Sequence, residues 1–175
     1  MDMNRLTERV QHVLVGAQEI AKERQQQELK VLHVLYAMLS QEDYMLLRVL
    51  EIHDIQPEQF RAFIEEELRK LPQVSGGNIQ VYMSRSLNDA LEAAWKTAQE
   101  MEDEYLSVEH LLLSFFGGTS DEMKTIKKKY GLDRQKVLFA IQQIRGNQKV
   151  TSANPENTYE ALKKYGRDLV EEVKK

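Results

Sequence analysis

The 175-residue sequence has no cysteine, which excludes a disulfide framework, a thiolate metal site and a cysteine nucleophile. It has no apolar run near the ~18 residues that a membrane-spanning helix needs, and its N-terminus leads into an amphipathic pattern rather than a signal core. Positive charge is not in excess, because 24 Lys and Arg stand against 28 Asp and Glu, a net charge of −4. We therefore expect a cytoplasmic protein that binds neither nucleic acid nor membrane.

Motifs for catalysis are absent as well. The sequence has no G-x-x-x-x-G-K-[ST] phosphate loop, no G-x-S-x-G nucleophile motif and no H-E-x-x-H metal motif. His33 and His110 each lack a second histidine or carboxylate four residues along. We therefore expect the chain by itself to be no enzyme, to carry no metal and to need no cofactor.

What the sequence does contain is one unit present twice, at a constant offset (110 − 33 = 77). The stretch Leu29–Leu39 matches Leu106–Phe116, and each copy places a histidine near the start of an apolar helix. Further pairs match at the same offset: Thr7/Ser84, Val10/Leu87, Leu14/Leu91, Ala17/Ala94, Ala21/Ala98, Val49/Ile126, Phe60/Val137 and Ile64/Ile141. An internal duplication of this length predicts two copies of one structural unit.

Each copy has the pattern of four helices, the first long and the others short. Thr7 and Ser84 occupy N-cap positions before the long helices, Pro57 and Asp133 mark the starts of the last helices, and Gly131 and Gly146 are placed to end helices. The only alternating β-branched stretch, 78–83, is too short and isolated to form a sheet.

We therefore predict an all-α fold of two tandem four-helix repeats related by a pseudo-twofold axis, plus a C-terminal linker helix. The predicted domain spans residues 1–146, with repeat one at about 4–70 and repeat two at about 84–146. Residues 147–175 are predicted to be a linker that leads into a further module, with an amphipathic helix from Tyr159 that has no element to pack on.

The polar residues of the second copy allow more than one interpretation. His33 and His110 fit a packing or capping role better than a metal site. Glu109 lies in a first helical turn, where the helix dipole favours a carboxylate, but its counterpart is Leu32, which suggests an asymmetric surface role instead. The acidic run Glu100–Glu104 is typical of a solvated face. A groove where the two repeats meet would offer apolar side chains to a partner, unless these residues are all core.

The duplicated unit, Thr-x-x-(Val/Leu)…Ala…Ala…His-(Leu/Val)-Leu, resembles the Clp N-terminal domain of ring-forming AAA+ chaperones over about Asn4 to Arg145. Three stretches are similar to ClpB-type disaggregases: Arg5–Thr7, the connector Leu71–Val74 and the tail Tyr159–Leu169. The tail implies that the chain stops just short of the first ATPase module.

The resemblance implies a module that captures exposed apolar segments of unfolded or aggregated proteins. The complete protein would be a hexameric, ATP- and Mg-dependent stress-response chaperone acting with a DnaK-type system, whereas this chain would be monomeric. Polar positions tied to client binding in the family match Thr7, Asp103 and Glu109. Flanking groove positions match Ala93, Thr97 and His110, which are less apolar than a leucine-lined groove.

Two alternatives stay open on the same resemblance. ClpC-like relatives use the domain to bind adaptors and, through paired glutamates, phosphoarginine. Glu109 keeps one of these glutamates, but Leu32 replaces the other. A purely structural spacer that assists ring assembly is the second alternative.

Overall fold

In the computed structural model, which describes residues 3–160, eight α-helices follow a short 3₁₀ turn at Met3–Arg5, and residues 155–160 are helical as well. Repeat one contains α1 (Glu8–Glu23), α2 (Val31–Ser40), α3 (Tyr44–Ile52) and α4 (Pro57–Arg69). Repeat two contains α5 (Arg85–Glu100), α6 (Val108–Phe116), α7 (Asp121–Tyr130) and α8 (Arg134–Arg145). Every helix of repeat two starts 77 residues after its counterpart, so the predicted fold of two four-helix repeats is confirmed.

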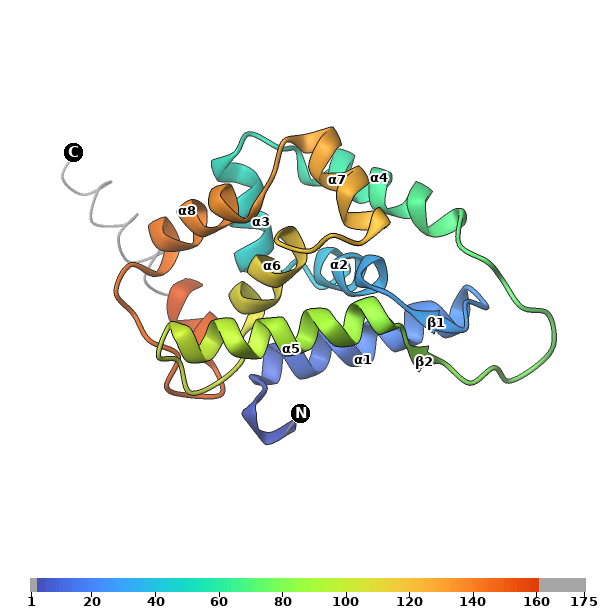
Figure 1. The fold of residues 1–175 in the computed structure, drawn as a ribbon, viewed down its shortest axis with the longest axis horizontal. Helices are drawn as coiled ribbons and strands as arrows, with labels where there is room; N and C mark the ends of the chain where they lie inside the picture. The colour runs from blue at the N-terminus through green and yellow to red at the C-terminus, as the bar shows by residue number, and fades with distance from the viewer. Residues whose placement is uncertain (1–2, 161–175) are drawn as a thin grey trace, which may run out of the picture.

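The helices form three layers, with α2 and α6 in the middle (Figure 1). Helices α1 and α5 cover one side of this central pair, and α3, α4, α7 and α8 cover the other. All nine residues of α6 are buried, as are eight of the ten in α2, because both are surrounded by neighbours. One continuous hydrophobic core therefore runs through both repeats.

Two short backbone pairings join the repeats and show the pseudo-twofold relation. Strand β1 (Glu28–Leu29) runs parallel to β2 (Tyr82–Met83), with Leu29 opposite Met83. An isolated parallel bridge joins Leu6 to Leu106. These pairings are equivalent, because Leu106 is the counterpart of Leu29 and Met83 that of Leu6. The expectation that 78–83 forms no sheet was wrong for its last two residues, since their partner strand lies in the other repeat.

The predicted caps are confirmed. Thr7 Oγ1 accepts a hydrogen bond from the Val10 N–H at 3.3 Å, and Ser84 Oγ accepts one from the Leu87 N–H at 3.0 Å. Helix α4 starts at Pro57, and α8 is capped by Asp133. Helices α7 and α8 end at Gly131 and Gly146, whose φ angles of 65° and 57° suit glycine.

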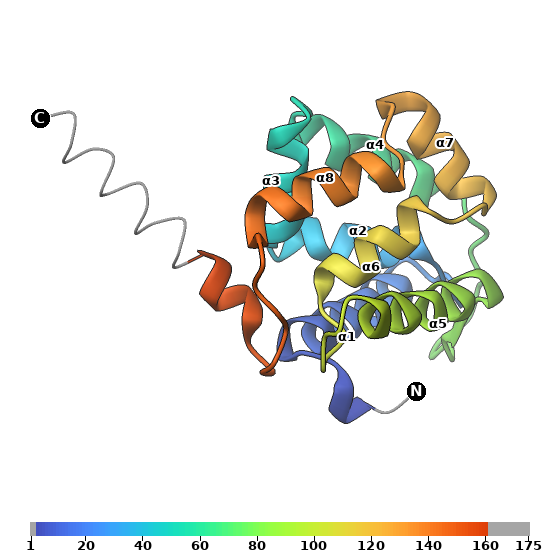
Figure 2. The same ribbon diagram turned by 60° about the vertical axis from the view of Figure 1, so that its left-hand side comes forward.

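Residues 147–160, which follow α8, pack back onto the domain (Figure 2). The Glu104 N–H donates to Val150 O at 2.8 Å, and the Glu8 N–H donates to Ala153 O at 2.9 Å. Residues 155–160 are helical, and Tyr159 is buried, so the expectation that this helix has nothing to pack on was wrong where it is described. Residues 161–175, the rest of that predicted helix, lie outside the described residues. Within 3–160, no helix is long and apolar enough to cross a membrane.

Candidate functional site

The two matching histidines cap the central helices. His33 Nδ1 accepts a hydrogen bond from the Lys30 N–H, and His110 Nδ1 accepts one from the Ser107 N–H, both at 2.9 Å. Since Nδ1 is the acceptor, the neutral ring carries its proton on Nε2 and donates from there. The predicted capping role is thus confirmed, and both rings are fully buried.

The partner of Nε2 differs between the repeats. His33 Nε2 donates to Gln26 Oε1 at 2.7 Å, and the Gln26 amide donates onward to Leu68 O at 2.6 Å. His110 Nε2 donates to Asp103 Oδ2 at 2.7 Å. A neutral amide in repeat one is therefore replaced by a carboxylate in repeat two, at equivalent positions.

That carboxylate belongs to a buried ionic network centred on Arg145 of α8. Arg145 Nη2 lies 2.8 Å from Asp103 Oδ1, and Nη1 lies 3.0 Å from Asp103 Oδ2 and 2.8 Å from Glu109 Oε2. The Ser107 hydroxyl donates to the other oxygen of Glu109. Burial alone would raise the pKa of Asp103, but the hydrogen bonds from His110 and Arg145 outweigh it and hold that pKa well below its usual range.

Three linked differences between the repeats create this network. The counterparts of Asp103, Glu109 and Arg145 in repeat one are Gln26, Leu32 and Leu68. Repeat one therefore shows that the same helix-capping histidine is buried with a neutral amide as the partner of its Nε2 atom. In the described part of the chain, no group of histidine and carboxylate side chains could hold a metal ion. The arrangement is that of a buried structural network, with each charge paired.

Two expectations about this region were wrong. Glu109 has no exposed surface and faces Arg145, so it plays no surface role in this structure. Asp103 is 6% exposed, whereas its neighbours Glu102 and Glu104 are exposed, so the acidic run is not a uniformly solvated face. The network also holds the chain after α8, because the Val150 N–H donates to Asp103 Oδ1 at 2.9 Å.

Thr7 belongs to the same buried region through a different partner. Its hydroxyl donates to Glu156 Oε1 at 2.9 Å, while Arg9 Nη2 donates to Asn157 Oδ1 at 3.3 Å. Burial, with Glu109 and Asp43 nearby, raises the pKa of Glu156 to about 7. Its Oε2 has no hydrogen-bond partner in the described residues. Residues 153–160, which we call the docked segment, thus pack against the start of α1.

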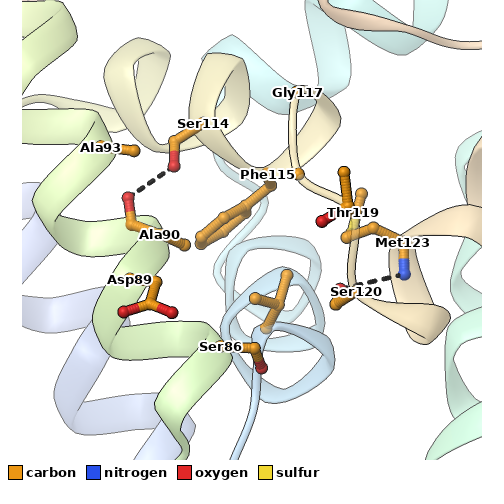
Figure 3. Close-up of a pocket in the computed structure, with 12 residues that line it drawn as sticks. Ser86, Asp89, Ala90, Ala93, Ser114, Phe115, Gly117, Thr119, Ser120 and Met123 are labelled. Atoms are coloured by element: carbon orange, nitrogen blue, oxygen red, sulfur yellow. Dashed lines mark hydrogen bonds between the residues drawn. The ribbon is translucent and has the colours of Figure 1, made fainter.

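A groove lies on the surface of repeat two, with Val31 of α2 at one side of it (Figure 3). This groove has a volume of about 340 Å³ and runs between α5 and the turn that joins α6 to α7. Its apolar part is formed by Val31, Ala90, Ala93, Phe115 and Met123. Its polar part is formed by Ser86, Asp89, Ser114, Thr119 and Ser120, and Gly117 and Gly118 complete it.

The six residues that the resemblance pointed to do not lie together in the structure. The buried region holds Thr7, Asp103, Glu109 and His110. Only Ala93 lines the groove. Thr97 is buried, and its hydroxyl accepts a hydrogen bond of 3.4 Å from Arg134. Contact between any of the six and a client stays a prediction.

Sequence reasoning missed Arg145, Glu156 and the hydroxyl residues of the groove. The repeat offset carried a signal for Arg145, because a charge stands where repeat one has Leu68 in its apolar stripe. Glu156 has no counterpart in the repeat and left no such signal. Ser86 lies in the first turn of α5 and Ser120 is the N-cap of α7, and neither was singled out from the sequence.

The sequence matches a known protein family and known proteins. Residues 5–130 match the family described as the Clp repeat (R) N-terminal domain. The chaperone protein ClpB of Nitratidesulfovibrio vulgaris is 42% identical over 179 residues, which cover 100% of this chain and 21% of that protein. The chain spans about a fifth of the length of such ClpB relatives.

Solved structures share the fold. The N-terminal domain of Hsp104 from Candida albicans superposes with a TM-score of 0.73 at 22% identity, covering 86% of this chain and 98% of that one. The N-domain of ClpV from Vibrio cholerae gives a TM-score of 0.66 at 19% identity, covering 85% and 88%. At these identities the likeness shows the fold alone.

Proposed function

The chain belongs to the Clp repeat N-terminal domain family and matches the N-terminal region of ClpB chaperones, and from this premise we propose that it binds clients. Its role would be to capture exposed apolar segments of unfolded or aggregated polypeptides for a ClpB-type disaggregase. The complete protein would form a hexamer, use ATP and Mg, and cooperate with a DnaK-type chaperone system. The chain itself would be a monomeric, cytoplasmic binding module without enzymatic activity.

The groove of repeat two is the observation that carries the proposal. Small side chains keep it open, because Ala90 and Ala93 present only methyl groups along α5 and the turn opposite begins with Gly117 and Gly118. Phe115, Met123 and Val31 supply apolar surface between them. A shallow apolar groove rimmed by hydroxyls makes weak contacts with many sequences, which suits a partner that must later be released.

The buried network supports this choice of site indirectly. Thr7, Asp103 and Glu109 are buried and bonded to Glu156, Val150 and Arg145, so in this structure they hold the domain together. We therefore assign the direct contacts to the groove. The family's polar positions would act through the stability of the domain.

No observation favours the phosphoarginine alternative over this one. A phosphorylated guanidinium would need Glu109 to be accessible, whereas this carboxylate is fully buried and already paired with Arg145. We therefore retain client capture as the proposed function.

A titration tests the proposal. Reduced, carboxymethylated α-lactalbumin, which stays unfolded, is added to the 15N-labelled chain, and amide shifts are followed by NMR. The proposal predicts saturable shifts at groove residues. Ala93→Lys should weaken binding at least tenfold, because an ammonium in the groove must be desolvated. Gln99→Lys, which adds the same charge at another exposed position of α5, should leave the affinity within twofold. Equal affinity in both variants would refute the assignment of the groove.

A further inference from the structure

The docked segment occupies, in repeat one, a place equivalent to one end of the groove in repeat two. The docked segment contacts Thr7, Glu8 and Arg9 at the start of repeat one. Arg9 Nη1 also lies 3.3 Å from Asp43 Oδ1. We call these four residues the repeat-one docking site. Their counterparts 77 residues later are Ser84, Arg85, Ser86 and Ser120, and of these Ser86 and Ser120 line the groove.

Both places also include the start of the central helix of the other repeat. Tyr159 of the docked segment lies close enough to Glu109, near the start of α6, for that carboxylate to raise its pKa, after the larger effect of burial. The counterpart of Val108 and Glu109 is the start of α2, where Val31 lines the groove. Each site is thus built from the first turn of a long helix, the turn after a central helix, and the start of the central helix of the other repeat.

The other end of the equivalent place in repeat one is narrowed by Gln41. Its side-chain amide donates to His12 O at 3.0 Å and lies over Gly16, where a Cβ atom would come within 2.6 Å of it. The counterparts of Gln41 and Gly16 are Gly118 and Ala93, which both line the groove. The docked segment therefore covers one end of this place in repeat one, and Gln41 reduces the other end to a hollow of about 190 Å³, against about 340 Å³ for the groove in repeat two.

We propose that the groove is the vacant counterpart of the repeat-one docking site and that it takes a client segment as one short, uncharged helical turn, placed as residues 155–160 are placed. This deepens the proposed function and depends on it for the identity of the ligand as a client. The occupant is a turn that starts at a residue able to begin a helix and carries one aromatic or large aliphatic side chain.

The helical form follows from the occupant already in place. Residues 155–160 are helical, and Pro155 stands at the first helical position, where its fixed φ favours a helix start. Glu156 and Tyr159, three residues apart, lie on one face of this turn and are both buried. Binding of this kind uses side chains at i and i+3 and leaves the ligand backbone hydrogen-bonded within its own turn.

The preference for uncharged segments follows from the residues that differ between the two sites. Arg9, which holds Asn157 and lies 3.9 Å from Glu160, is replaced by Ser86 in the groove. Asp43 and Glu109 are replaced by Ser120 and Leu32. A client carboxylate in the groove would lose the arginine that faces the docked segment, and burying it without a partner is costly.

A peptide of this chain tests the proposal directly. The probe is residues 151–160 carrying Glu156→Gln and Glu160→Gln, added to the 15N-labelled chain. We expect amide shifts at Ser86, Ala93 and Ser120, and transferred NOEs typical of a helix in the bound peptide. The peptide with both glutamates should bind at least threefold more weakly, and Tyr159→Ser in the probe should weaken binding tenfold.

The results separate this proposal from the broader function. Shifts confined to Thr7 and Arg9 would show exchange with the docked segment and would overturn the assignment to the groove. An extended bound peptide, or tighter binding of the version with both glutamates, would overturn the helical or uncharged preference. If unfolded α-lactalbumin binds at the groove and the peptide does not, this inference fails and the proposed function stands. If the peptide binds and α-lactalbumin does not, the proposed function fails instead.

Discussion

The Thr7 hydroxyl and the Glu156 carboxyl form a buried hydrogen bond of 2.9 Å across 149 residues of sequence, so the first helix and the segment after the last helix are joined directly. Thr7 does two things at once, because the same hydroxyl accepts from the Val10 N–H and caps α1. In repeat two Ser84 caps α5 without any such partner from the docked segment. The domain is therefore closed by its own C-terminal extension at one of two equivalent places.

Thr7→Ala should cost more than Ser84→Ala. Loss of an N-cap hydroxyl costs about 1 kcal/mol, which is what we expect for Ser84→Ala. Thr7→Ala also removes a donor from the buried Glu156, so we expect about 2 kcal/mol or more. Urea unfolding of both variants measures the difference. Equal losses would show that the hydrogen bond to Glu156 contributes nothing.

The raised pKa of Glu156 predicts a pH dependence with a definite sign. With a pKa of about 7 in the folded chain against 4.5 for the free group, the folded state binds the proton more tightly between these values. The stability contributed by the protonated form is therefore lost as pH rises from 4.5 to about 7. Glu156→Gln should be more stable than the parent at pH 8, by up to about 3 kcal/mol, and equal to it near pH 4.5. Urea unfolding across this range measures it, and a constant difference at every pH would contradict the account.

His33 should titrate in the opposite sense. Burial, with the charges of Arg24 and Lys30, lowers its pKa to about 4, so the folded chain keeps the ring neutral. Stability associated with the neutral ring is then lost as pH falls from 6.5 towards 4. NMR of the imidazole carbons measures the midpoint for this ring. A midpoint at 6 or above would show that the ring is not buried as described.

The buried ionic network can be tested by replacing its charged residues with their counterparts from repeat one. Arg145→Leu alone leaves the carboxylates of Asp103 and Glu109 buried without their arginine, and should cost about 3 to 5 kcal/mol. The triple change Asp103→Gln, Glu109→Leu, Arg145→Leu installs the repeat-one residues, and should recover most of that loss. Thermal unfolding of the single and triple variants measures the loss of stability and its recovery. A triple variant as unstable as the single one would contradict the equivalence of the repeats.

Much of the fold could be predicted because its determinants are local and present twice. A constant offset aligned all four helix starts, and capping hydroxyls and glycines marked the boundaries. The pairing of Leu29 with Met83 could not be predicted, since two residues carry too little β pattern and the partner strand lies 54 residues away.

The candidate site was less predictable for a physical reason. Whether Glu109 is exposed depends on Arg145 and on the docked segment, which lie far along the chain and meet it only in the folded state. The groove is open because Gly117 and Gly118 have no side chains, and because the small Ser86 stands where repeat one has Arg9. The difference in size between the two equivalent places is visible only in the folded structure.

The most direct test of client capture is where a bound client lies. A nitroxide on unfolded α-lactalbumin should broaden the amide signals of Ala93, Ser114 and Thr119 in the 15N-labelled chain, and should leave those of Gly16, Ser40 and Gln41 sharp. Broadening centred on Gly16 and Gln41, or spread evenly over both repeats, would contradict capture in the groove of repeat two.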